Sequence, residues 1–214
     1  SGGDIQLANQ SVIDVSGTGG GAIELRGRAI TLVERSALIS DTLGDSDGLD
    51  IQIVGDRVSL SDNSYLGAAT SGSGNSGNIS VTAAQDIEVT GTTFVDYKQL
   101  ELNTFLGTRQ IADREIGGSV TNATASGRTG DISLKAQRLL LDEGVLISTE
   151  SFGTGDSGDI DITATESVRL DGSGILAGSR ITGVALLTPT GIPTGLSTVG
   201  IPAGSGGNID ITTA

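Results

Sequence analysis

A short alternating motif recurs along the chain: Gly, a small or polar residue, Ile, a mostly polar residue, and then Leu, Ile or Val. It occurs at Gly3–Leu7, Gly21–Leu25, Gly77–Val81, Gly130–Leu134, Gly158–Ile162 and Gly207–Ile211, and with one extra residue at Gly48–Ile53. The steps between the first isoleucines are 18, 28, 28, 53, 28 and 49 residues. Alternation with period two predicts short strands that have one buried face and one wet face.

Two further apolar runs follow each motif. The second run, seven or eight residues on, is found at Ile30–Leu32, Val58–Leu60, Ile87–Val89 and Val168–Leu170. The third is found at Leu38–Ile39, Tyr65–Leu66, Leu146–Ile147 and Ile175–Leu176. Strands this short need neighbours, and stacking each unit on the next supplies them. The pattern predicts an all-β right-handed parallel β-helix with three short strands per coil of about 28 residues. A β-sandwich would explain the short strands but not the recurrence.

The composition indicates a thin core. The chain has 34 Gly, only two Tyr and three Phe, and no Trp, Met, Cys or His, so the core must consist of stacked Ile, Leu and Val. Such branched side chains pack well on a pleated surface. Gly and Asn at the corners are expected to supply the positive φ of sharp turns.

The repeat is interrupted twice. We expect residues 1–214 to form a single β-helix segment of a longer protein, with loop insertions at about 92–129 and 179–205. The second insertion holds all three prolines, which cannot donate to a strand ladder. Because an uncovered sheet edge invites aggregation, we also expect neighbouring sequence or a cap to cover each end.

The segments Leu139–Ser148 and Gly153–Ile160 carry a family resemblance. They resemble the Gly-rich stalk repeats of filamentous-haemagglutinin-like proteins of two-partner secretion, of the cyanobacterial type. The resemblance covers most of residues 1–91 and 128–179 and the final coil from Gly206. It implies a secreted or outer-surface protein, an outer-membrane secretion partner, and adhesive or unknown roles, and it brings no universal catalytic residues to carry over.

Charge and missing residue types exclude several functions. There are 26 acidic against 12 basic residues, a net charge of −14. This argues against binding nucleic acid or anionic lipid, which need a positive surface. No apolar run is long enough for membrane insertion. Without His or Cys, the chain has neither the usual His-dependent nucleophiles nor a conventional zinc site.

One turn offers ligands for calcium. Asp45, Asp47 and Asp50 are closely spaced around Gly48, and such carboxylates suit a hard cation. The remaining ligands of a complete calcium loop are absent, so the alternative is a solvated acidic turn. A calcium-stiffened surface-layer module is one functional hypothesis, and we expect no other cofactor.

An enzyme on the same fold is a second hypothesis. The outward column of the first strand is expected to contain Gln6, Glu24, Gln52, Ser80, Ser133, Asp161 and Asp210. Asp161 and Asp210 would pair if they lay on adjacent coils, and glycoside hydrolysis needs two carboxylates. Polysaccharide lyases and hydrolases also use such a face. Aromatic platforms for sugar are missing from these strands, so we predict a polar wet face and no enzyme.

The first insertion carries the binding candidates. Loops on a rigid scaffold often carry function, and we select Tyr97, Lys98, Phe105, Arg109 and Arg114. The alternative is that they only cover one side of the rod. The sequence therefore predicts a non-catalytic secreted scaffold or adhesin segment, with a cell-surface carbohydrate or protein as its partner.

Overall fold

The computed structural model describes residues 2–91, 115–120, 126–143, 145–151, 153–171, 174–179, 196–197 and 204–213. These residues form a β-solenoid in which all paired strands are parallel and equivalent coils are about 28 residues apart. None of these segments forms a helix of the length and hydropathy that a membrane span requires. The predicted fold class is confirmed.

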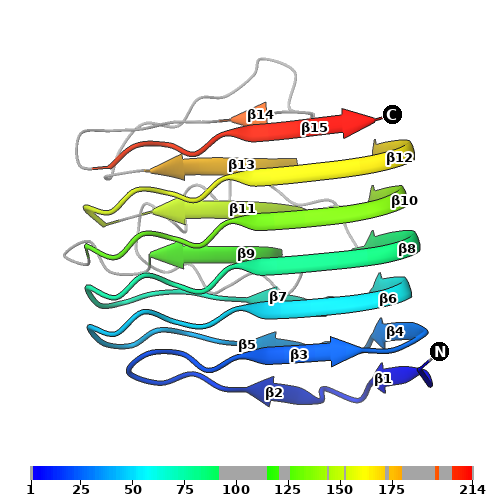
Figure 1. The fold of residues 1–214 in the computed structure, drawn as a ribbon, viewed down its shortest axis with the longest axis horizontal. Coiled ribbons are helices and arrows are strands. Elements are labelled where there is room, and N and C mark those ends of the chain that lie inside the picture. Colours follow the sequence, from blue (N-terminus) through cyan, green and yellow to red (C-terminus); the bar gives the residue numbers. More distant parts are fainter. Residues whose placement is uncertain are drawn as a thin grey trace.

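Two sheets run the length of the rod (Figure 1). The first has the order β1 (Ile5–Leu7), β4 (Ala29–Leu32), β6 (Ile51–Leu60), β8 (Ile79–Thr90), β10 (Ile132–Asp142), β12 (Ile160–Asp171) and β15 (Ile209–Thr213), with β3 (Ile23–Arg26) also paired to β6. The second contains β2 (Val12–Asp14), β5 (Ala37–Ile39), β7 (Tyr65–Gly67), β9 (Glu115–Val120), β11 (Leu146–Ser151), β13 (Gly174–Ser179) and β14 (Leu196–Ser197).

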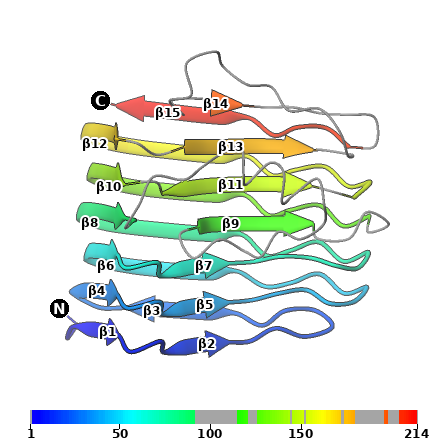
Figure 2. The same ribbon diagram turned by 180° about the vertical axis from the view of Figure 1, so that it is seen from behind.

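The solenoid is right-handed. In Figure 1 the near strands of the first sheet run to the right while the chain rises towards β15. Seen from behind in Figure 2, the near strands of the second sheet also run to the right. This is the hand that right-twisted strands favour in parallel crossovers.

The first and second apolar runs share one bent strand in each regular coil. β6, β8, β10 and β12 each continue through both runs, and the register shifts between them, for example between Gly55 and Arg57. The three predicted runs are thus present, but the corner between the first two is a bulge within a strand.

Identical side chains stack through the core. Ile51, Ile79, Ile132 and Ile160 are partners on successive coils, and each is at most 1% exposed. Full burial of one such side chain contributes roughly 1.5–3 kcal/mol. The polar residue that follows each of these isoleucines along its strand faces outward, as the alternation predicts.

The lowest coil is out of step with the predicted repeat. Ile5 pairs with Ile30, so β1 lies under the second run and not under the first. The prediction that Gln6 begins the column of Glu24 was wrong, because Gln6 pairs with Thr31. The step of 18 residues from Ile5 to Ile23 therefore covers only part of a coil. The other members of the column are confirmed as in-register partners.

Strands also occur inside the segments assigned to the insertions. β9 falls within 92–129 and continues the second sheet between β7 and β11, and β14 falls within 179–205 and pairs with β13. β8 pairs directly with β10, and β12 with β15. The prolines of the second segment, Pro189, Pro193 and Pro202, lie outside the described residues.

Among the described residues, positive φ occurs at the corner between the second and third runs, where it is adopted by Asn, as expected, but not by Gly. The residues with left-handed φ include the consecutive pairs Asn9–Gln10, Glu34–Arg35 and Asp62–Asn63, between the second and third runs. The glycines before the first run, such as Gly77 and Gly130, do not adopt it. The predicted reason for those glycines was wrong, and close packing between coils replaces it.

Candidate functional site

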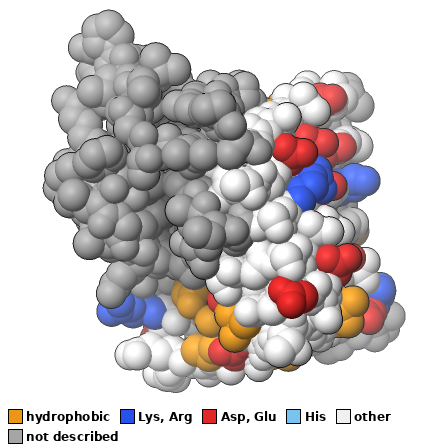
Figure 3. Space-filling view, turned by 90° about the vertical axis from the view of Figure 1, so that its left-hand side faces the viewer, with side chains coloured by type: hydrophobic (Ala, Val, Ile, Leu, Met, Phe, Trp, Pro, Cys, Tyr) orange, Lys and Arg blue, Asp and Glu red, His pale blue; other side chains and the backbone are white. Residues whose placement is uncertain are grey.

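The polar turns that lead into the first sheet lie on one side of the rod. We call residues 44–50, 72–78, 126–131, 153–159 and 204–208 the turn edge. Figure 3 views the molecule from this side, where acidic side chains recur from coil to coil. The turn edge holds the predicted calcium ligands and the richest set of polar contacts.

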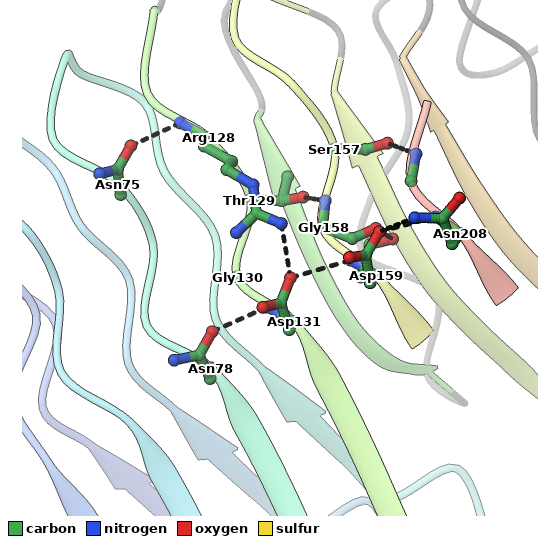
Figure 4. A network of polar contacts seen from close by, with 12 residues as sticks. Asn75, Asn78, Arg128, Thr129, Gly130, Asp131, Ser157, Gly158, Asp159 and Asn208 are labelled. Carbon is green, nitrogen blue, oxygen red and sulfur yellow. Dashed lines mark hydrogen bonds and ion pairs between the residues drawn. The ribbon is translucent and has the colours of Figure 1, made fainter. Parts of the chain in front are cut away.

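A ladder of Asp and Asn side chains joins the coils (Figure 4). Asp50 Oδ1 accepts hydrogen bonds from the backbone N–H of Asn78 at 2.8 Å and from its Nδ2 at 3.1 Å. Asn78 Oδ1 accepts the N–H of Asp131 at 2.8 Å, and Asp131 Oδ1 accepts that of Asp159 at 2.9 Å. Asp159 Oδ1 accepts the N–H of Asn208 at 2.7 Å. Each rung uses a side-chain oxygen of the earlier coil, which Asp and Asn both carry.

Two further columns repeat the arrangement beside this ladder. Hydroxyl oxygens of Ser76, Thr129 and Ser157 accept the N–H groups of Gly130, Gly158 and Gly207 at 2.7, 2.5 and 2.8 Å. Oδ1 atoms of Asp47, Asn75 and Asp156 accept those of Asn75, Arg128 and Ser205 at 2.8, 2.8 and 2.5 Å. Backbone donors that no strand ladder satisfies thus find side-chain acceptors in the coil before.

A column of glycines permits this close stacking. A Cβ added to Gly77, Gly130, Gly158 or Gly207 would overlap the carbonyl oxygen of the residue below it, which is Leu49, Gly77, Gly130 or Gly158. Glycine is therefore required because two backbones approach closely.

The charges on the ladder are separated by amides except at one step. Asp50 and Asp131 are separated by Asn78, whereas Asp131 and Asp159 are direct neighbours. At that step Arg128 Nη2 lies 2.7 Å from Asp131 Oδ1. The guanidinium reduces the repulsion between the two stacked carboxylates.

The three predicted calcium ligands are used between coils. Asp45 Oδ1 accepts the hydroxyl of Ser73 at 2.6 Å, and Asp47 and Asp50 accept bonds from Asn75 and Asn78. Within the described ranges, no group of three acidic side chains is arranged to hold a metal ion. The geometry favours the acidic-turn interpretation of these residues.

A second set of carboxylates lies where β2 and β5 run into the turns. Burial raises the pKa of Asp41, although the N–H of Ala69, 2.9 Å away, partly offsets this. Hydrogen bonds from Ser16 lower the pKa of Asp14. Ser16 Oγ also accepts the N–H of Asp41 at 3.0 Å, which links the two carboxylates.

An alternating ion-pair row crosses the bulges of the first sheet. Arg57 lies 3.4 Å from Asp86, and Arg138 lies 2.6 Å from Asp86 and 2.9 Å from Glu166. These contacts join β6, β8, β10 and β12, so the row connects four coils. The row places alternating positive and negative charges where the pairing register of the first sheet shifts.

The outward pair of the enzyme hypothesis is in place. Asp161 and Asp210 are direct partners on β12 and β15. Their Oδ1 atoms accept hydroxyl bonds from Thr163 at 3.0 Å and Thr212 at 3.2 Å.

The predicted binding residues cannot be placed. Tyr97, Lys98, Phe105, Arg109 and Arg114 lie outside the described residues, so the structure does not bear on them.

The sequence carries a pattern that indicates the ladder. An Asp or Asn directly precedes the first isoleucine at Ile51, Ile79, Ile132, Ile160 and Ile209. The motif defined from the repeat alone allows any small or polar residue at this position. Its restriction to side chains with a short oxygen acceptor indicates a shared hydrogen bond.

Comparison with protein-family models finds no match to this chain, and comparison with curated proteins and with solved structures finds none either. Its function must therefore be argued from its own residues.

Proposed function

We propose that this chain is a non-catalytic segment of a secreted, filamentous-haemagglutinin-like surface protein, and that it acts as a scaffold or adhesin. The observation that supports this most is the use of the turn edge: Asp50, Asn78, Asp131 and Asp159 bind the next coil. Polar groups that could serve chemistry are committed to building the rod, which is the property of a scaffold.

The proposal includes a place and partners. The repeat resemblance supports an outer-surface or released location of the cyanobacterial type, reached through an outer-membrane secretion partner. A cell-surface carbohydrate or protein is the proposed ligand, bound by the candidate residues around Tyr97 and Arg109. The acidic net charge of −14 supports a partner other than nucleic acid or anionic lipid.

A polysaccharide lyase or hydrolase is the second candidate, favoured by the adjacency of Asp161 and Asp210. Catalysis would also need groups that converge on the substrate beside this pair. The calcium-stiffened module has less support, because its proposed ligands already accept hydrogen bonds. A calcium-dependent rise in melting temperature would favour it.

Calorimetry against a panel of cell-surface polysaccharides tests the proposal, with each mixture later assayed for cleavage products. Saturable heat without cleavage is expected for an adhesin, and it should be lost in Tyr97→Ala/Arg109→Ala but kept in the control Lys135→Gln. Cleavage that is lost in Asp161→Asn would replace the proposal by the enzyme. An absence of heat would restrict the role to a passive scaffold.

A further inference from the structure

Ser157 Oγ donates forward to Ser205 O at 3.4 Å, but the inter-coil bonds of the turn edge that join a side-chain oxygen to a backbone N–H all have the same direction. In each, a side-chain oxygen of the earlier coil accepts a backbone N–H of the later coil. The later-coil donors are Asn75, Asn78, Arg128, Gly130, Asp131, Gly158, Asp159, Ser205, Gly207 and Asn208. Beside this edge, Asp41 and Ala69 donate to Ser16 and Asp41 in the same direction.

Backbone bonds at the same turns run in both directions between coils. Gly48 N–H donates to Asn75 O in the next coil, and Ile51 N–H donates to Asn78 O. Each turn therefore has some backbone N–H groups that donate forward to the next coil, and others that donate back to side chains and carbonyls of the coil before. A coil that lacks either neighbour leaves backbone N–H groups unpaired, but only a missing predecessor also removes the side-chain acceptors of the turn edge.

Packing has the same asymmetry. Gly158 lies over the carbonyl of Gly130, so the earlier coil defines the surface on which the later turn settles. The corner with left-handed residues differs, because there Asn9 and Ser36 donate N–H groups forward to Glu34 and Ser64. The direction is therefore a property of the turn edge.

We infer that the turn edge is a directional template, on which the coils form in order from β1 towards β15. Each completed coil displays side-chain acceptors and glycine carbonyls in the positions that the next turn requires. The new turn then becomes ordered with the N–H groups that point back to the preceding coil already satisfied. The order of assembly is thus set by contacts between neighbouring coils and does not depend on what the rod binds.

Pulse-labelling hydrogen exchange during refolding of the full chain tests this order, read strand by strand with mass spectrometry. Amides of β6 should become protected before those of β8, then β10, and then β12 and β15. Two matched variants sharpen the test, because Asp50 and Asp159 each bond the N–H and Nδ2 of an Asn in the next coil.

Asp50→Ala should slow protection of β8, β10 and β12 about fivefold, the effect of losing one net hydrogen bond formed before the rate-limiting step. Asp159→Ala should slow β15 and leave β6 and β8 at the wild-type rate. Protection of β12 or β15 before β6, or simultaneous protection of all strands, would overturn the template. Equal slowing of β6 and β8 by Asp159→Ala would do the same. If Asp50→Ala does not fold, the order of protection in the wild type and the effect of Asp159→Ala still test the directional template.

Discussion

At the scale of single residues, the turn edge depends on side chains that are absent or short. Gly158 must lack a Cβ because the carbonyl of Gly130 occupies that space, while Thr129 must be short enough to place its hydroxyl beside the Gly158 N–H. Space and hydrogen bonding thus restrict neighbouring positions in different ways.

Gly158→Ala should destabilise the protein by at least ~2 kcal/mol, because the added methyl group forces two backbones apart. Gly3→Ala is the control, since a Cβ there meets no atom within 4 Å. Denaturant unfolding measures both variants, and an equal loss of stability in the two would contradict the packing argument.

Thr42 and Thr70 form a second matched pair. Thr70 Oγ1 donates to Gly74 O at 2.7 Å, whereas Thr42 Oγ1 is buried without a hydrogen-bond partner among the described residues. Thr70→Val should cost about 1–3 kcal/mol because it leaves a buried carbonyl unpaired, and Thr42→Val should be neutral or stabilising. Thermal unfolding compares them, and a larger loss for Thr42→Val would refute this account.

Asp41 gives a pH dependence with a defined sign. Burial raises its folded pKa above the ordinary value of 3.8, so the folded state holds the proton more tightly than the unfolded state. Its cost to stability is absent below pH 3.8 and develops as the pH rises through the folded pKa. Asp41→Asn should therefore be more stable than wild type at pH 7, with a smaller difference at pH 3. Unfolding at both pH values measures this, and a constant difference would disprove it.

At the scale of strands, a row of ion pairs crosses the bulges at which the register of the first sheet shifts. The alternating row Arg57–Asp86–Arg138–Glu166 crosses four strands at the point where their pairing shifts. The two arginines and Glu166 are exposed and Asp86 is half-buried, so one contact alone contributes little in water. Arg138 is the exception because one guanidinium serves two carboxylates on different coils.

Arg138→Gln should lower stability by up to ~1 kcal/mol, with a smaller effect in 1 M salt. Arg169→Gln is the control, because Arg169 pairs with Asp171 of its own strand at 2.7 Å. Denaturant unfolding at two salt concentrations compares the variants. A loss for Arg169→Gln that matches that for Arg138→Gln would remove the special role of the inter-coil contact.

The sequence predicted the strands better than it predicted how the strands and coils contact one another. Strand periodicity located the runs around Ile51, Ile79 and Ile132 because burial on a pleated sheet imposes a period of two. It misplaced Gln6, because the motif at Ile5 also fits the second run. The roles of Asn78 and Asp131 were missed since they arise only when two coils are superposed.

At the scale of the whole molecule, the rod is a linear array in which each coil contacts only its neighbours. Ile51, Ile79, Ile132 and Ile160 are enclosed on both sides, whereas Ile5 and Ile209 are only partly buried. Stability in such an array is close to a sum of terms from each coil and each interface.

Native-state hydrogen exchange should therefore be slowest in β8 and β10 and faster towards β1 and β15, because terminal coils open without breaking two interfaces. Amide exchange followed by mass spectrometry measures this profile. Uniform protection from β1 to β15 would instead indicate a single cooperative unit.

The interchangeability of ladder residues has a consequence for inheritance. Asp50, Asn78, Asp131 and Asp159 occupy one position and each accepts through its side-chain Oδ1, so coils from different parts of the chain present compatible surfaces. Unequal recombination that duplicates or deletes a unit of 28 residues would join coils whose contacts already match. Such a gene can change the length of its product in whole coils without redesigning any junction.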